Sequence, residues 1–457
     1  MKKNMLICAP VSSRSGYGAH ARDLVTSLIN HDKYHIKIMD VPWGTTPRNA
    51  LTEDTTINNN KIKQHLLNPG ESLNQQPDIY VDIRIPNEFQ THGKFNIGIT
   101  AGIETTAVSQ NWIEGCNKMD LIIVPSQHSK RGFVDSIYDK VQNLPDGKQQ
   151  KVGELKLEKP MEVLFEGADE NVYKPLSVKE IDSKFFDWLN DEVPERFAYL
   201  HVGQWGKGNI GDDRKDIGTL IRTFYEVFAN SKKQPALILK SCGATFSILD
   251  REECLSKIRQ IKDMFPKGFK LPNVYLLHGS LSDEEMNYLY NHPKVKSFVT
   301  FTHGEGFGRP LLEATMTGLP VIATGWSGHL DFLNPVECLL LNGELKQVPK
   351  SAVWKDIVIE QSQWFHADPT FSRNSLKHSF ENHEVAKRKA KSLMDKNRGK
   401  FTLNKMTDEF GVILEKYLKN VPQQVSLNLP KLKKVNQDKN KIKLPKLKKV
   451  GKTEATI

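Results

Sequence analysis

Two short apolar runs separated by a glycine-rich loop constrain the fold of this chain more than any other feature. The runs cover residues 297–301 and 319–323, and their length and their β-branched or aromatic content are typical of strands buried on both faces. Between them, the loop at 304–308 leads to Pro310, which can open a helix because its missing N–H would be unpaired in the first turn anyway. The segment therefore predicts a strand, a glycine loop, a helix and a second strand in succession.

The same alternation of strand and helix patterns runs along most of the chain. A first set of strand candidates covers residues 5–9, 35–39, 78–84, 95–99, 120–124 and 161–165, and a second set covers 197–202, 236–240, 274–278, 297–301, 319–323 and 337–341. Amphipathic helix patterns follow the first strand of each set, over 21–29 and 217–228. Strands that alternate with helices predict parallel sheets wound on both faces, so the expected fold class is α/β.

A length of 457 residues exceeds what one ordinary core holds and predicts two domains with smaller additions. Residues 139–160 are polar, contain a Pro-Asp-Gly turn and five Lys, and are expected to form a mobile hairpin outside the core. The expected organisation is a first domain at 1–170, a polar linker at 171–195, a second domain at 196–400, an amphipathic terminal helix at 401–420 and a tail at 421–457.

The formal net charge of +10 is concentrated in the tail. Residues 421–457 contain ten Lys, no Arg and two acids, a net of +8, which leaves +2 for residues 1–420. The sequence Leu-Pro-Lys-Leu-Lys-Lys-Val occurs twice there, and with so few large apolar groups we expect a disordered basic arm. Such an arm suits peripheral contact with an anionic membrane. Nucleic acid is the less suitable partner because the arm has no Arg and no aromatic residue. A merely solubilising tail is the alternative.

Localisation follows from hydropathy and cysteine usage. No apolar run approaches the roughly 18 residues that a membrane helix needs. The apolar stretch at 5–9 is short for a signal peptide and leads straight into a glycine turn and a helix pattern. The five cysteines are scattered without a Cys-x-x-Cys pair, as buried thiols of a reducing cytosol would be. We therefore expect a cytoplasmic protein that contacts the inner membrane face peripherally.

Two carboxylates flank the place where an anion would rest in the glycine loop. Glycines allow close approach of the backbone to a ligand, and the free N–H groups of a first helical turn favour an anion. Glu305 in the loop and Glu313 in the helix would repel a phosphate unless they point at hydroxyl groups. The residue types therefore suggest a nucleotide sugar. The alternative is common packing, since acidic residues near a helix start are favoured by the helix dipole alone.

The motif Glu-Gly-Phe-Gly-x-Pro-x-x-Glu-Ala, followed by Gly-x-Pro-Val-Ile-Ala, covers 305–323 and resembles the signature of the GT4-type retaining glycosyltransferases. The resemblance implies the GT-B fold, in which two doubly wound Rossmann-like domains face each other across a cleft. It also implies that the terminal helix packs back on the first domain. By the same resemblance, Glu305 contacts hydroxyls of the donor sugar, Glu313 binds the nucleotide ribose, and Gly306, Phe307 and Gly308 belong to the donor site.

A second match to this family begins at residue 199. Residues 199–205 and 214–221 resemble the first strand, loop and helix of the family's C-terminal domain, where an Arg and a Lys contact the donor phosphates. Lys215 aligns well, whereas the Arg that usually follows the strand glycine is replaced by Gln204 in a longer loop. Arg214 can supply the lost charge, because Arg grips phosphate through two parallel hydrogen bonds. The alternative for this pair is a solvated helix start.

The N-terminal half offers weaker matches. Gly16 and Gly18 resemble the glycine loop that approaches the donor phosphates from the opposite side, although a simple tight turn would look the same. Glu104 resembles an acid that lines the acceptor side of the cleft in some relatives. Three histidines near motif edges (His201, His303 and His329) are more typical of packing than of a catalytic base.

No Asp-x-Asp stands at a strand end and no histidines cluster with ligand spacing, so no metal site and no cofactor are expected. The GT-B resemblance implies transfer without a metal, in which Lys215, Arg214 and helix dipoles stabilise the leaving diphosphate. The expected function is retaining transfer of a hexosyl unit from a nucleoside-diphosphate sugar to a hydroxyl of a glycan, lipid-linked or other acceptor. A nucleotide-sugar epimerase or hydrolase, a transferase acting on nucleic acid through the tail, and a catalytically inactive binding protein are the alternatives.

Overall fold

The computed structural model describes residues 2–53, 56–68, 70–71, 73–144, 148–243 and 245–422. Nearly all of the predicted basic arm lies outside the described residues, so its disorder and its membrane contact stay predictions. None of the helices within the described ranges combines the length and the apolar character that crossing a membrane requires.

Six parallel strands form the N-terminal sheet, in the order β2-β1-β3-β4-β5-β8. Their bounds are β1 Lys3–Ala9, β2 Tyr34–Asp40, β3 Ile79–Ile83, β4 Phe95–Ile99, β5 Leu121–Val124 and β8 Met161–Val163. The predicted first set of strands is confirmed to within a few residues at each end. Every residue of β3 and of β5 is buried, as expected for strands covered on both faces.

The helices of this half fill the connections between its strands. They are α1 Gly16–His31, α2 Ala50–Glu53, α3 Ile57–His65, α4 Gln110–Lys118 and α5 Gln127–Asp135, with a 3₁₀ turn η1 at Pro86–Glu88. The amphipathic pattern predicted α1 correctly, because Ala21, Leu24, Val25 and Leu28 are fully buried. Ser15 caps this helix by accepting a hydrogen bond from the Gly18 N–H.

Six parallel strands also form the C-terminal sheet, in the order β11-β10-β9-β12-β13-β14. Their bounds are β9 Ala198–Val202, β10 Ala236–Lys240, β11 Val274–Leu277, β12 Val295–Val299, β13 Val321–Thr324 and β14 Leu339–Leu341. The helices are α7 Ile217–Phe228, α8 Ile248–Lys262, α9 Asp283–Asn291, α10 Arg309–Met316 and α11 Pro369–Glu381, with a 3₁₀ turn η3 at Gly328–Asp331. The predicted succession of strand, glycine loop, helix and strand is therefore confirmed as β12, loop, α10 and β13.

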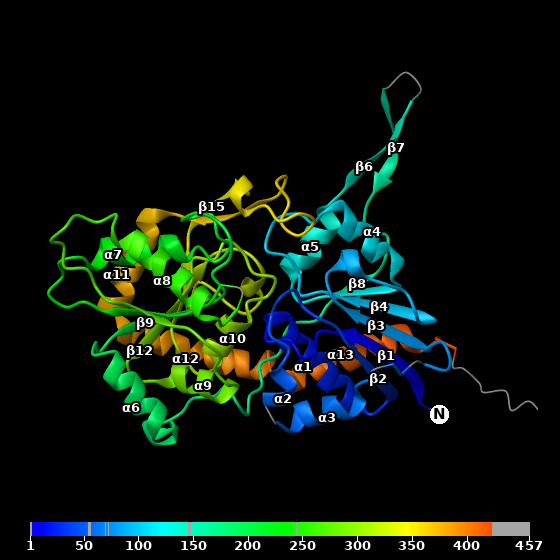
Figure 1. The fold of residues 1–457 in the computed structure, drawn as a ribbon, viewed down its shortest axis with the longest axis horizontal. Helices are drawn as coiled ribbons and strands as arrows, with labels where there is room; N and C mark the ends of the chain where they lie inside the picture. Colours follow the sequence, from blue (N-terminus) through cyan, green and yellow to red (C-terminus); the bar gives the residue numbers. More distant parts are fainter. Residues whose placement is uncertain are drawn as a thin grey trace, which may run out of the picture. The chain divides into compact units, whose positions relative to one another are not determined.

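Two antiparallel hairpins lie outside these sheets. Strands β6 Tyr138–Asn143 and β7 Gln149–Leu155 pair within the predicted insertion and extend away from the N-terminal sheet (Figure 1). The second hairpin, β15 Gly343–Gln347 with β16 Gln363–Ala367, was not predicted, and a 3₁₀ turn η4 at Lys350–Ala352 lies between its strands. The Thr106 N–H donates to the Gln363 carbonyl at 2.9 Å, so the second hairpin contacts the N-terminal half.

The predicted linker at 171–195 contains regular structure. It holds a 3₁₀ turn η2 at Val178–Glu180 and helix α6 at Ser183–Glu192, which buries Phe185 and Leu189 and packs against α9. Asp182 caps α6 by accepting from the Phe185 N–H. The polar composition of the segment hid this helix, although the spacing of four between its two buried residues is a helical signal.

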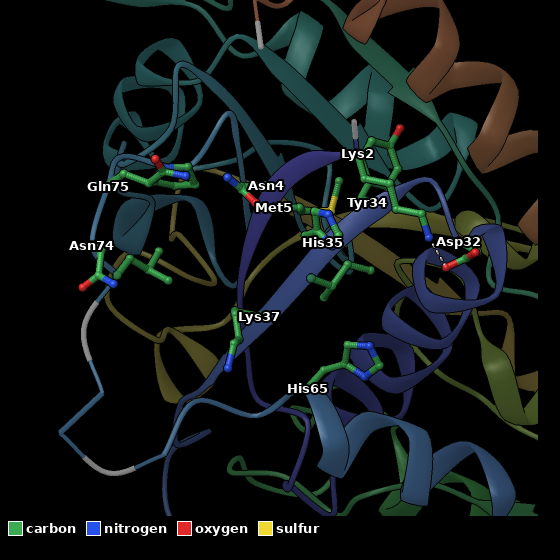
Figure 2. Close-up of a pocket in the computed structure, with 13 residues that line it drawn as sticks. Lys2, Asn4, Met5, Asp32, Tyr34, His35, Lys37, His65, Asn74 and Gln75 are labelled. Atoms are coloured by element: carbon green, nitrogen blue, oxygen red, sulfur yellow. Dashed lines mark hydrogen bonds and ion pairs between the residues drawn. The ribbon is translucent and has the colours of Figure 1, made fainter. Parts of the chain in front are cut away.

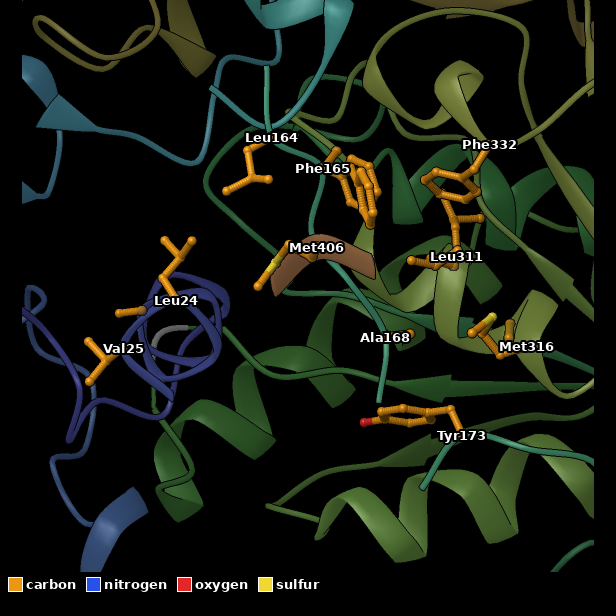
Figure 3. Packing of buried hydrophobic residues seen from close by; sticks show 14 of the residues in the cluster. Leu24, Val25, Leu164, Phe165, Ala168, Tyr173, Leu311, Met316, Phe332 and Met406 are labelled. Atoms are coloured by element: carbon orange, nitrogen blue, oxygen red, sulfur yellow. The ribbon is translucent and has the colours of Figure 1, made fainter. Parts of the chain in front are cut away.

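The last two helices connect the halves. Helix α12 His383–Lys400 packs against α10, and α13 Leu403–Leu418 packs against α1. Thr407 in α13 bonds to Ser27 in α1, with 2.7 Å between the hydroxyl oxygens. One apolar cluster continues through this junction, with Leu24 and Val25 of α1, Met406 of α13 and Leu311 of α10 among its members (Figure 3). Burial of such a shared surface resists separation of the two halves.

Candidate functional site

Strand order brings the predicted site residues to one edge of the C-terminal sheet. The order reverses direction between β9 and β12, and open α/β sheets bind ligands at the carboxyl ends of such a strand pair. The chain after β9 leads to Arg214 and Lys215, and the chain after β12 carries Glu305. The corresponding reversal in the N-terminal sheet lies between β1 and β3, and the chain after β1 carries Gly16 and Gly18.

Glu305 is the centre of a buried charge cluster. Its Oε1 accepts a hydrogen bond from Lys215 Nζ at 2.5 Å, and its Oε2 lies 3.5 Å from Arg214 Nη1. The Glu305 N–H donates to Ser327 Oγ at 2.9 Å, which fixes the backbone of the loop. Glu305 is 7% exposed and Lys215 is 8% exposed, so water screens their attraction only weakly.

The pKa values of this pair show how the cluster is balanced. Burial alone would raise the pKa of Glu305, but the charges of Lys215 and Arg214 outweigh it and lower that pKa to about 2. Burial is the largest influence on Lys215 and lowers the pKa of its ammonium, against the opposing effect of Glu305. Glu305 is therefore a carboxylate at neutral pH, held by two cations.

Arg214 extends the cluster into the N-terminal half. Its Nη1 also lies 3.2 Å from Oε1 of Glu104, which stands between β4 and α4. Burial disfavours the guanidinium charge, while Glu104 and Glu305 raise the pKa of Arg214 above its ordinary value. Four predicted site residues, Glu104, Arg214, Glu305 and Lys215, thus form one chain of alternating charges across the two halves.

Glu313 lies in a second cluster. Its Oε1 accepts from Arg309 Nε at 2.9 Å and its Oε2 accepts from Tyr290 Oη at 3.2 Å. Burial raises the pKa of Glu313 to about 7, against the opposing effect of Arg309. Arg309 Nη1 forms an ion pair with Asp23 of α1, so this cluster too includes both halves.

Packing against the N-terminal half explains why the loop contains glycines, and the sequence did not reveal this. A Cβ on Gly304 would lie 2.0 Å from the Glu104 carbonyl oxygen, and a Cβ on Gly306 would lie 2.1 Å from that of Ala101. Both glycines therefore allow the loop to approach the backbone of the N-terminal half. Gly308 has a φ of +100°, a conformation that favours glycine, and caps α10.

Three further predicted donor residues have distinct surroundings. The Phe307 side chain is 2% exposed and packs on Phe332, with 5.0 Å between ring centroids, so any ligand contact at Phe307 would use its backbone. A Cβ on Gly18 would lie 2.1 Å from the Ser13 carbonyl oxygen, which shows that the turn itself requires glycine. Gly16, in contrast, has open space where a Cβ would be.

The histidines near the motif edges are bound to backbone carbonyl groups. His201 Nδ1 lies 3.0 Å from the Val299 oxygen, His303 Nδ1 lies 2.6 Å from the Phe365 oxygen, and His329 Nε2 lies 2.6 Å from the Thr324 oxygen. All three residues are fully buried. These bonds agree with the packing role expected from the sequence.

Sequence reasoning missed three residues of these clusters. Tyr17 Oη accepts from the Ala101 N–H at 3.0 Å and lies 2.6 Å from Thr100 Oγ1, which joins the first helix turn to the end of β4. Arg309 and Asp23 were also missed. Arg309 carried a weak signal, since a cation directly after the loop glycine interrupts an otherwise apolar helix start. Nothing in the sequence pointed to Asp23.

A cavity of about 700 Å³ opens at the amino ends of β1 and β2, whereas the predicted site residues follow the carboxyl ends of the strands (Figure 2). Its charged side chains are paired locally, because Lys2 Nζ lies 2.5 Å from Asp32 Oδ1 and Lys37 Nζ lies 2.8 Å from Glu71 Oε1. None of the predicted site residues lines it. We therefore assign no role in the chemistry to this cavity.

Within the part of the chain that the structure describes, no three His, Cys, Asp or Glu side chains form a group suited to a metal ion. The expectation that the reaction needs no metal or cofactor stays a prediction. Lys215 and Arg214, the cations expected to bind the diphosphate, are bonded to carboxylates in this structure.

Comparison with known proteins identifies the fold. No protein-family model and no curated protein sequence matches the chain. Among solved structures, sucrose-phosphate synthase from Thermosynechococcus elongatus is similar with a TM-score of 0.59 and 12% identity over 92% of this chain and 100% of that one. An α,α-trehalose 6-phosphate synthase from Burkholderia multivorans has a TM-score of 0.56 and 10% identity over 92% and 100% of the two chains.

The Anabaena protein HepE, in complex with UDP and glucose, has a TM-score of 0.54 and 14% identity over 91% of this chain and 100% of that chain. Such low identities establish similarity of fold alone. These similar structures and the two parallel six-stranded sheets show that the chain has the GT-B fold, as the resemblance in the sequence implied.

Proposed function

We propose that this chain is a glycosyltransferase that moves a hexosyl unit from a nucleoside-diphosphate sugar to an acceptor hydroxyl, with retention of configuration. The observation that carries the proposal is the bond between Lys215 and Glu305 at the carboxyl ends of β9 and β12, with Arg214 beside it. The structure of HepE, which has the same fold, is a complex with UDP and glucose, and this supports a nucleotide-sugar donor.

In the proposed reaction, Lys215 and Arg214 bind the donor diphosphate and stabilise the charge that develops on it as the glycosidic bond breaks. Both cations are paired with carboxylates in this structure. The arriving diphosphate would share these cations with Glu305 and Glu104 and would leave Glu305 able to accept hydrogen bonds from sugar hydroxyls. In this structure Glu305 is ionised, because the charges of Lys215 and Arg214 outweigh burial and lower its pKa to about 2.

Glu313 is proposed to bind the nucleotide ribose, and the backbone of residues 306–308 the diphosphate. Glu104 is proposed to face the acceptor, because it comes from the half of the molecule opposite α10. Attack from the face of the leaving diphosphate would require no nucleophile from the protein.

The test is turnover of a panel of nucleotide sugars with and without glycan, lipid and nucleic-acid acceptors, with the anomeric configuration of the product determined by NMR. Formation of an α-linked product from an α-linked donor supports the proposal. Release of free sugar at the same rate whether or not any acceptor is present would contradict it.

The basic arm is proposed to hold the enzyme at an anionic membrane surface. The support is its net charge of +8 with alternating Leu, Val and Lys. A chain ending at Asn420 should fold and turn over donor like the full chain but should no longer sediment with vesicles of anionic lipid. Equal sedimentation of the two chains would contradict this part of the proposal, and a gel shift with DNA seen only for the full chain would favour nucleic acid.

A further inference from the structure

Arg309 holds together two elements that the proposed donor site needs. It is the first residue of α10, and its guanidinium uses two different nitrogens for two carboxylates. Nε donates to Glu313 Oε1 at 2.9 Å, one helical turn further along α10, while Nη1 pairs with Asp23 in α1. The Arg309 side chain is only 14% exposed, so both bonds form largely out of water.

Each partner of Arg309 is linked to a different part of the site. Glu313 is the residue proposed to bind ribose, and its other oxygen accepts from Tyr290 Oη. Asp23 lies in α1, whose first turn carries Gly16 and Gly18. The guanidinium therefore connects the ribose carboxylate of one half with the helix that begins at the glycine turn of the other half.

Charge in this region depends on Arg309. The carboxyl groups of Asp23, Glu313, Glu166 and Asp283 all interact electrostatically with it, as do Tyr173 and His20. Of the other cations, Arg22 acts on Asp23. Glu166 is 7% exposed and has no hydrogen bond to the described residues, so it does not compete with Asp23 and Glu313 for the hydrogen bonds of Arg309.

We propose that Arg309 is a positioning residue for the donor: it orients the Glu313 carboxylate and couples that orientation to the placement of α1. The inference rests on the proposed donor role of Glu313. Lysine cannot replace arginine here, because a single ammonium cannot reproduce a planar fork that reaches two carboxylates in different directions. Arg309 itself need not touch the donor.

Calorimetry first identifies which of UDP, GDP and ADP the unaltered chain binds most tightly. The dissociation constant of that nucleoside diphosphate is then measured for each variant. We expect Arg309→Lys to weaken binding by about 10-fold, a typical size for coupling between sites. Glu313→Gln should weaken it similarly. The double variant should be no weaker than the weaker single variant, because Arg309 acts through Glu313.

Asp23→Asn keeps the bond between Arg309 and Glu313 and removes the charge of the partner in α1, which weakens the connection to that helix. It should weaken nucleotide binding by a smaller factor, about 3-fold. This variant also covers the case in which Arg309→Lys does not fold. Arg373→Lys is the matched control, because Arg373 pairs with Glu226 on the surface of the same half and should leave binding unchanged.

Two results would overturn the inference while leaving the proposed function intact. One is unchanged binding in both Arg309→Lys and Asp23→Asn. The other is a double variant whose loss equals the product of the two single losses, which would mean that Arg309 and Glu313 act independently. If the unaltered chain binds none of the three nucleotides, the proposed function fails, and the inference fails with it.

Discussion

Glu305 and Glu313 belong to one short motif and are almost equally buried, at 7% and 6% exposure, but their pKa values move in opposite directions. Burial raises the pKa of both carboxyl groups. At Glu305 the combined charges of Lys215 and Arg214 outweigh burial and the pKa is about 2. At Glu313 the single guanidinium of Arg309 is shared with Asp23, and the pKa is about 7.

The number of cations for each carboxyl group, rather than depth of burial, therefore decides which group is ionised. A carboxylate that stays charged suits Glu305 for contact with groups whose charge changes during the reaction. Glu313, whose pKa is about 7, is suited to form hydrogen bonds with the two hydroxyl groups of a ribose, which change little along the reaction. We infer that the two clusters divide catalysis from ground-state binding.

The strongest test of this difference removes the cation nearest Glu305. Lys215→Met should reduce turnover at least about 100-fold, because it removes charge that acts on the leaving diphosphate. It should also lower the free energy of unfolding by about 3 kcal/mol, since a buried carboxylate loses its closest partner. Steady-state kinetics and denaturant unfolding measure the two effects.

A double variant separates the two losses. Adding Glu305→Gln to Lys215→Met removes the unpaired charge, so stability should recover in large part while turnover stays low. Lys350→Met is the control, because the Lys350 side chain is 87% exposed and its ion pair with Glu360 is on the surface. Near-normal turnover in Lys215→Met would remove Lys215 from the proposed machinery.

Glu313→Gln should have a smaller and different effect. A glutamine resembles the protonated form of Glu313, so we expect the KM for the donor to rise by about 10-fold with kcat close to that of the unaltered chain. The comparison between the two carboxyl groups would be broken if kcat itself fell as far as it does in Lys215→Met.

Glu166 sharpens the comparison, because it is a buried carboxyl group that forms no hydrogen bond or ion pair with a cation of the described residues. Burial raises its pKa from 4.5 to about 8 in the folded state. Between these pH values the unfolded chain ionises Glu166 and the folded chain does not, so this group lowers stability increasingly as pH rises from 4.5 to 8. Glu166→Gln should therefore match the unaltered chain near pH 4.5 and exceed it by on the order of 2 kcal/mol at pH 8.

Thermal or denaturant unfolding at both pH values measures this effect. Glu158→Gln, at an exposed position, should show no such dependence on pH. A constant difference between Glu166→Gln and the unaltered chain at the two pH values would mean that the carboxyl group is ionised in the fold.

The smallest expected effect is that of a chelator. The proposed mechanism assigns the charge around Glu305 to Lys215 and Arg214 alone, so excess EDTA should leave turnover unchanged. Loss of activity that Mg²⁺ or Mn²⁺ restores would show that side-chain cations do not suffice, and would contradict the division of roles drawn from the two clusters.

The amino-acid sequence determined the strands, the main helices and the fold class of this protein. All twelve predicted strands are present, and α1 and α7 bury the predicted faces, because these features depend on patterns within about 20 residues of chain. A separate resemblance at residues 199–221 selected Lys215 and Arg214, which the structure places beside Glu305.

Only the tertiary structure decided which charges meet. The bonds from Arg309 to Asp23 and from Arg214 to Glu104 join residues that are far apart in the sequence, and no local pattern predicts such a pair. The same holds for Gly304 and Gly306, whose close neighbours are backbone atoms of the other half. Strand and helix patterns are local, whereas ionisation depends on the sum of all charges packed around a group, and that sum exists only once the two halves have come together.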